Sequence, residues 1–346
     1  MDRFGIGKVG LPRFGVGEFR LPVFGGSGRG SGGQGIPKPD VYYDLSLKDN
    51  SSPTRNIMDD LSGNRHDAEI FNAAYALGSG YGKYTVDFNS WRKENTNINV
   101  TSSSITITGV LQSQIIVHYE DRISKEWKVQ ITGLPASKSI FYRYYEDGDT
   151  YKQYEINKNG VYLLPPSIKT SGNTGFICSS NDMDKLTNLT ITQIPDYQGA
   201  FVFDGIDDYA VMQDEKKGFK TLFMEVVPFN LNKMIYDQRD TTNNFAIFNE
   251  PNSVAYNARN NGVTYINGKL NQTIISNNLI DKRQIITIVN GNVGNATRKN
   301  ITIGSSSLHN EHFSNMALYK LIGFYDELTP LQIEKVIQKY NLKFDE

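Results

Sequence analysis

The chain of 346 residues is long enough to form two or three domains, each with its own hydrophobic core. Its 36 basic and 37 acidic residues give a formal net charge of −1, which does not favour binding to nucleic acid or to an anionic membrane. It lacks the run of about 18 apolar residues that a membrane-spanning helix needs. The first residues also lack the apolar segment of a secretory signal, so we expect neither membrane insertion nor secretion.

The composition suits strands better than helices. The chain holds 20 Tyr and 18 Phe and is rich in Thr, Ile and Val, which fit the pleated surface of a sheet. The single cysteine, Cys178, follows Phe176 and Ile177 in an apolar run, which indicates a buried structural thiol rather than a nucleophile. Because no intramolecular disulfide can form, we expect an all-β fold that is held by its hydrophobic core.

A short internal repeat occupies the beginning of the chain. It starts at Arg3 and again at Arg13, each copy opening Arg-Phe-Gly and ending Leu-Pro, and a truncated third copy follows from Val23. Glycine and proline prevent this segment from folding alone, yet its apolar residues recur at regular intervals that a plain linker lacks.

We expect residues 1–36 to be an extended Phe/Gly-repeat anchor and flexible linker that orders against a partner surface. The side chains expected to be buried in that contact are Phe4, Leu11, Phe14, Leu21 and Phe24. The alternative is a disordered tail whose hydrophobicity is accidental.

Two motifs lie far apart in the sequence. The first is Asp-Leu-Ser-Gly-Asn at 60–64, a turn before an expected strand, and the second is Phe-Asp-Gly-Ile-Asp-Asp-Tyr at 203–209. Both resemble motifs of laminin-G-like, concanavalin A-like domains. In the second, Asp204-Gly205 supplies a turn between apolar strands. The stretch Val263–Leu270 reads as a hairpin with an Asn-Gly turn. The resemblance implies a two-layered jelly roll.

The end of the chain predicts strands over Phe313–Tyr325 and then a short helix. Thr329 is placed as N-cap, Pro330 as the first helical residue, and Gln332 as the partner that closes a capping box. We expect the helix to run to about Tyr340 with Ile333, Val336, Ile337 and Tyr340 turned inward. Laminin-G-like domains often end in such a helix.

The two motifs are separated by well over 100 residues, whereas in ordinary members of the family they lie close together. We therefore expect a discontinuous jelly roll formed by residues 37–82 and 196–346. The intervening residues 83–195 alternate apolar and polar side chains in several short runs, for example at 104–108 and 127–131. Strands at this spacing predict an inserted second β-sandwich.

The sequence does not favour an enzyme. Glycoside hydrolases of concanavalin-like fold need two carboxylates at a fixed separation, and no Glu-x-Asp-x-x-Glu run is present. Glu225 stands in a strand-like run without such a partner. We therefore predict no catalytic residues and no cofactor; the alternative is a polysaccharide hydrolase.

Two candidate binding sites remain. Asp204, Asp207 and Asp208 offer the oxygen ligands that calcium prefers, and some relatives in the resembled family bind calcium; the alternative is a structural role in the turn. Tyr142, Tyr144 and Tyr151 can share one face of a predicted hairpin, depending on its register, and aromatic faces bind sugars. The alternative for these tyrosines is core and cross-strand packing.

The layout of repeat anchor, split laminin-G-like domain and inserted sandwich is similar to virion proteins of tailed phages. The resemblance is to head-fibre and tail-fibre proteins of crAss-like phages, and it rests on residues 60–64, 203–209 and Ala-Leu-Tyr-Lys at 317–320. It implies a non-enzymatic head-fibre or capsid decoration protein, assembled in the host cytoplasm, that binds other virion proteins through residues 1–36. Repeats of this kind suit a symmetric partner, so we expect a homotrimer rather than a homodimer.

One further hypothesis keeps the fold and changes the main role. A phage tail adsorption protein, or a lectin on a bacterial surface, would present the same sandwiches with glycan binding as its primary activity. Under the first hypothesis glycan binding is an accessory property of a structural protein.

Overall fold

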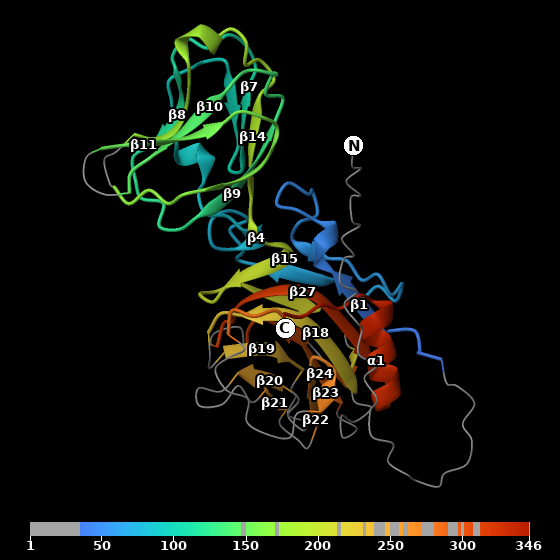
Figure 1. Ribbon diagram of the computed structural model, residues 1–346. Helices are drawn as coiled ribbons and strands as arrows, with labels where there is room; N and C mark the ends of the chain where they lie inside the picture. Colours follow the sequence, from blue (N-terminus) through green and yellow to red (C-terminus); the bar gives the residue numbers. More distant parts are fainter. Residues whose placement is uncertain are drawn as a thin grey trace, which may run out of the picture. The chain divides into compact units, whose positions relative to one another are not determined.

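The computed structural model describes residues 35–146, 150–169, 173–212, 216–230, 233–238, 246–249, 256–258, 262–270, 280–289, 297–298, 301–306 and 312–345. Within them the protein is built almost entirely of antiparallel strands, with one α-helix near the end of the chain (Figure 1). The all-β prediction is confirmed at this level. The predicted anchor residues Phe4, Leu11, Phe14, Leu21 and Phe24 lie outside the described residues.

The largest sheet has the order β23-β22-β24-β18-β27-β15-β4, and β1 pairs with β27. Every pairing in it is antiparallel. Its strands are β1 (Val41–Asp44), β4 (Gly80–Lys83), β15 (Asp196–Asp204), β18 (Thr221–Pro228), β22 (Val263–Ile266), β23 (Lys269–Leu270), β24 (Gln284–Val289) and β27 (Asn315–Phe324).

A second sheet has the order β2-β3-β16-β26-β19-β20-β21. Its strands are β2 (Ile57–Met58), β3 (Ala68–Phe71), β16 (Tyr209–Met212), β26 (Ile301–Ile303), β19 (Lys233–Asp237), β20 (Ala246–Asn249) and β21 (Tyr256–Ala258). A two-stranded sheet joins β17 (Lys216–Lys217) to β25 (Thr297–Arg298).

These two larger sheets share one hydrophobic core. It takes fully buried side chains such as Tyr43, Phe201 and Phe203 from the first sheet and Met212 and Ile303 from the second. Phe201 and Phe203 meet edge to face with ring centroids 4.9 Å apart. Because alternate residues of a strand face opposite ways, each sheet contributes one face to this core. The core is therefore assembled from residues 41–81 together with residues 201–321.

Residues between these stretches form two further sheets with their own core. The orders are β11-β10-β13-β8-β5 and β12-β9-β14-β7-β6, and the two sheets face each other in Figure 1. Their strands are β5 (Arg92–Lys93), β6 (Ile98–Val100), β7 (Ser104–Ile107), β8 (Ile115–Tyr119), β9 (Trp127–Thr132), β10 (Ile140–Tyr144), β11 (Lys152–Ile156), β12 (Gly160–Leu164), β13 (Thr174–Cys178) and β14 (Thr190–Ile194).

The core of this second pair of sheets is aromatic. Trp127 lies near its centre, with Phe88, Trp91, Tyr142 and Phe176 all within 6.2 Å of its ring centroid. Each fully buried aromatic side chain of this size contributes about 2–3 kcal/mol through removal from water. Its members run from Val86 to Ile191, so this core is separate in sequence from the first.

The only cysteine belongs to the second core. Cys178 is buried at the end of β13, and burial raises the pKa of its thiol to about 11. A thiol with so high a pKa is protonated at neutral pH and is a poor nucleophile. The prediction of a buried structural thiol is confirmed.

Three short 3-10 helices interrupt the loops: η1 (Leu45–Leu47), η2 (Phe88–Ser90) and η3 (Ser180–Asp182). Each begins after a residue whose side-chain oxygen accepts a hydrogen bond from the backbone N–H two residues later. These residues are Asp44, Asp87 and Ser179. Such local side-chain bonds satisfy donors that the first turn leaves unpaired.

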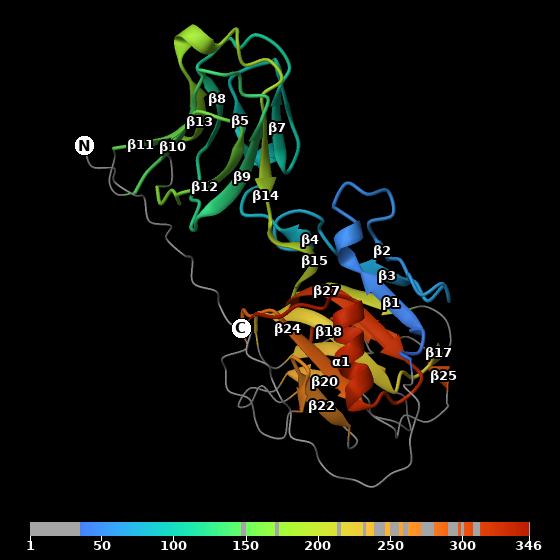
Figure 2. The ribbon, with the colours of Figure 1, turned by 45° about the vertical axis from the view of Figure 1, so that its right-hand side comes forward.

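Helix α1 (Pro330–Lys339) begins as the sequence predicts. Thr329 is the N-cap, its hydroxyl accepts from Gln332 N, and the Gln332 side chain accepts in return from Thr329 N at 2.9 Å, so the capping box is confirmed. Ile333 and Val336 are buried against the outer face of the largest sheet (Figure 2). No helix in the described residues is both long and apolar enough to cross a membrane.

One glutamine joins the two chain segments that connect the pairs of sheets. Gln193 is 2% exposed, and its Oε1 accepts hydrogen bonds from Thr85 N at 2.7 Å and Val86 N at 3.1 Å. Its Nε2 donates to Val86 O at 2.8 Å. The Gln193 side chain thus satisfies backbone groups just after β4, at the place where β14 leads into β15 (Figure 2).

We predict that Gln193→Ala lowers the free energy of unfolding by roughly 2–4 kcal/mol, because it leaves buried backbone groups without partners. Gln153→Ala, at an exposed position of β11, serves as the matched control and should change stability by less than about 0.5 kcal/mol. Urea unfolding followed by tryptophan fluorescence measures both. Equal stability of the two variants would show that the Gln193 amide is dispensable.

Candidate functional site

The turn between β15 and β16 carries the three predicted acidic residues. Gly205 has φ +79°, and a Cβ there would lie 2.7 Å from the Asn315 Cβ, so both conformation and space require glycine. Asp204 Oδ1 accepts a hydrogen bond from Ile206 N at 2.7 Å. The sequence Asp-Gly therefore makes a tight turn that returns the chain into the opposite sheet.

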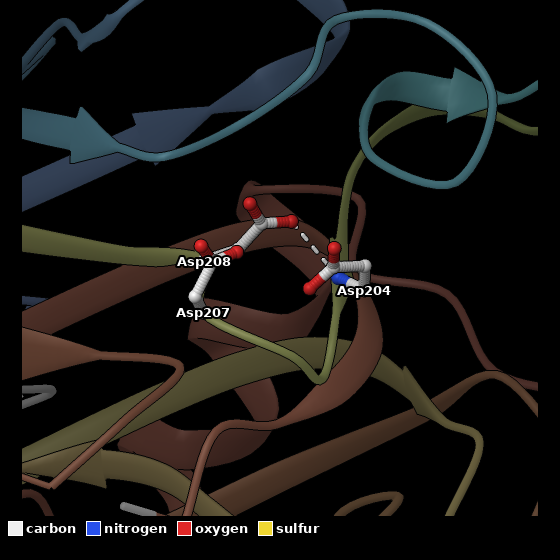
Figure 3. A group of neighbouring side chains, drawn as sticks. All are labelled: Asp204, Asp207 and Asp208. Atoms are coloured by element: carbon white, nitrogen blue, oxygen red, sulfur yellow. Dashed lines mark hydrogen bonds between the residues drawn. The ribbon is translucent and has the colours of Figure 1, made fainter. Parts of the chain in front are cut away.

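The turn brings the three carboxylates together. One oxygen from each of Asp204, Asp207 and Asp208 lies within 4.8 Å of the others (Figure 3). Asp207 is exposed and Asp204 half-buried, whereas Asp208 is fully buried. The Asn72 side chain donates to Asp207 O at 3.0 Å, which ties the turn to the residue after β3.

Asp208 is the unusual member of this cluster. Its Oδ2 accepts a hydrogen bond from Asp204 N at 2.9 Å, while its buried Oδ1 has no hydrogen-bond partner. Burial, with a smaller contribution from the charges of Asp204 and Asp207, raises the pKa of Asp208 to about 6. A buried carboxylate with no cation beside it is stabilised by a proton or by a bound cation.

The chemistry of this cluster fits a hard cation such as calcium. Calcium takes oxygen ligands, and three carboxylates can supply part of its coordination shell while water supplies the rest. The turn also uses these oxygens for its own hydrogen bonds, as the bonds to Ile206 N and Asp204 N show. Calcium at Asp204, Asp207 and Asp208 therefore stays a prediction beside the structural role.

The three tyrosines predicted as a glycan-binding face do not form one. Tyr142 is fully buried against Trp127 in the aromatic core, so its inclusion in an exposed face is wrong. Tyr144 stacks on Tyr142 with ring centroids 5.9 Å apart. Tyr151 is 47% exposed and instead lies beside Arg143, whose guanidinium is 4.6 Å from the Tyr151 ring centroid. Tyr142 therefore has the core-packing role that was the alternative for these tyrosines.

Glu225 does not resemble a catalytic carboxylate. It is fully buried in β18 and forms an ion pair with Arg283, whose guanidinium lies 3.5 Å from the Tyr319 ring centroid. Arg283 offsets part of the cost of burying this charge, and burial still raises the pKa of Glu225.

A groove that sequence reasoning did not find lies beside η1, β4 and the start of β15. It encloses about 630 Å³ and is lined by residues 46–49, by the tyrosines at 81 and 84, and by residues 192–195 and 198–199. The members with exposed or half-exposed side chains include Leu47, Asp49, Tyr84 and Gln198. No motif marks these residues, because only the pairing of β4 with β15 brings them together.

Comparisons with protein-family models, with curated proteins and with solved structures found no match.

The raised pKa of Asp208 predicts a pH-dependent stability difference. An aspartate has a pKa of about 3.9 in the unfolded chain, so the raised value means that the folded protein binds the proton more tightly. The contribution of Asp208 is fully present below about pH 4 and is lost as the pH rises through about 6. Asp208→Asn removes this charge, so the variant should gain stability relative to wild type between pH 4.5 and 7.5, as measured by urea unfolding.

Asp184→Asn, at an exposed position, is the control for loss of a carboxylate. A stability difference between Asp208→Asn and wild type that does not change with pH would contradict the raised pKa of Asp208. Calcium chloride at pH 7 distinguishes the two roles of the cluster: a bound ion raises the thermal midpoint of wild type and not of Asp208→Asn. A wild-type midpoint that is identical in calcium and in EDTA would exclude the calcium site.

Proposed function

We propose that this chain is a non-enzymatic structural protein of a phage particle, either a head-fibre or a capsid decoration protein. One observation carries the proposal: a repeated Arg-Phe-Gly segment precedes a compact unit that spans Ile36–Glu346. Repeats with regularly spaced Phe and Leu but no capacity to fold alone suit docking on a larger assembly. The compact unit would then be the displayed part.

The finer fold is part of this proposal. Residues 37–82 and 196–346 would form a laminin-G-like jelly roll, and residues 83–195 an inserted β-sandwich. Support comes from the first core, which combines residues 41–81 with 201–321, and from the second, which lies between Val86 and Ile191. A discontinuous domain of this kind makes a scaffold that presents its insert.

The partners follow from the anchor. Other virion proteins would bind residues 1–36, and a symmetric homotrimer would match a repeated docking sequence better than a dimer. The protein would assemble into particles in the host cytoplasm.

A second candidate function is that of a tail adsorption protein or bacterial surface lectin. The observation that favours it is the groove of about 630 Å³, which lies within the range of about 300–1,000 Å³ typical of small-molecule sites. In this case glycan binding would be the primary activity rather than an accessory one.

We predict that a chain lacking residues 1–35 folds normally and fails to join phage particles, because the repeat is removed while the compact unit Ile36–Glu346 is kept. Particle incorporation is measured by immunoblotting of purified virions produced in cells that express the truncated or the full-length chain. Circular dichroism and the thermal midpoint check the fold.

A full-length chain with Phe4, Phe14 and Phe24 replaced by Ser is the matched test of the repeat itself, and it should behave like the truncation. Undiminished incorporation of either variant would overturn the anchor. Failure of the full-length chain to associate with any particle would overturn the virion role.

A further inference from the structure

The groove beside η1 contains several polar groups that the protein already uses. Lys48 Nζ donates to Thr54 O and Ile57 O and forms an ion pair with Asp59 at 2.9 Å, so its charge is neutralised. Gln193 is occupied by its three hydrogen bonds with Thr85 and Val86. Neither group is available to a ligand without breaking the fold.

Other groups in the same groove have unused capacity. The exposed side-chain amide of Gln198 makes no hydrogen bond with any described residue. Asp49 accepts from Ser51 and Ser52 through Oδ1 alone, which leaves Oδ2 as a free acceptor. The bonds from Ser51 hold the pKa of Asp49 below its usual value, so this carboxylate is ionised at neutral pH.

Apolar surface lies next to these polar groups. Leu47 is 66% exposed in the groove, and the half-buried ring of Tyr84 lines the same space. Burial and then the charge of Asp49 raise the pKa of Tyr84, which places that carboxylate near the tyrosine. An aromatic ring beside a planar amide and a carboxylate is a combination that can bind the apolar face and the hydroxyl groups of a sugar together.

We infer that this groove binds a neutral, hydroxyl-rich glycan. Tyr84 and Leu47 contact the C–H face of a sugar ring, while Gln198 and Asp49 bind its hydroxyl groups. A neutral sugar is favoured over an acidic one, because the unneutralised charge in the groove is the Asp49 carboxylate and the lysine beside it is paired with Asp59. The volume of about 630 Å³ accommodates a small ligand of this class.

The inference deepens the glycan-binding part of the proposed function and is independent of the anchor, whose test is particle incorporation. The experiment applies the full-length chain to a glycan array that carries neutral and acidic oligosaccharides, and then measures the dissociation constant of the best neutral hit by calorimetry. Gln198→Ala and Asp49→Asn should each weaken binding about ten-fold, since each loses hydrogen bonds to the sugar. Tyr84→Phe keeps the ring and should bind nearly as wild type.

The matched controls are Gln153→Ala and Tyr151→Ala, which remove the same residue types from exposed positions outside the groove. They should bind as wild type does. An array with no hits, or with acidic glycans alone, would overturn the inference. So would neutral binding that survives Gln198→Ala and Asp49→Asn, or binding that Tyr151→Ala abolishes.

Discussion

Strand β27, near the end of the chain, pairs with three strands that come from distant parts of the sequence. It lies between β15 and β18, and β1 also pairs with it, so that Val41 is opposite Gly323. A Cβ on Gly323 would lie 2.8 Å from both Phe219 and Val41 side-chain atoms, which makes glycine necessary at this crossing. These pairings close long loops, and loop closure costs conformational entropy. Burial of the core that the paired strands form must offset this cost.

The second pair of sheets is inserted between two strands of this arrangement. It leaves after β4 and returns through β14 into β15, and β4 and β15 are hydrogen-bonded neighbours. The insertion therefore begins and ends at one place in the largest sheet and does not interrupt the strands paired with β27. The same neighbourhood forms the groove, so its shape depends on the close approach of Gly82 to Pro195, where a Cβ would lie 2.6 Å from Pro195 Cγ.

Local features could be predicted from the sequence because short-range chemistry determines them. The capping box at Thr329 and the turn at Asn267-Gly268, where both residues have positive φ, follow from the residues themselves. The face occupied by Tyr142 could not be predicted, because it depends on pairing with Phe176 in β13, a strand more than 30 residues later. The groove depends on the register of β4 against β15, to which no local pattern corresponds.

Two fully buried carboxylates, Glu225 and Asp208, have different charged neighbours. Glu225 faces Arg283, and Lys320 adds a second favourable charge nearby, but burial outweighs both and raises the pKa of Glu225. The Asp204 N–H and the Ser79 hydroxyl favour ionised Asp208, whereas burial and the charges of Asp204 and Asp207 oppose its ionisation. A charge that is buried among like charges raises the energy of the folded state unless a proton or cation joins it. At the turn of 204–208 the neighbouring aspartates oppose ionisation of the buried carboxylate, so its charge state depends on pH and on bound cations.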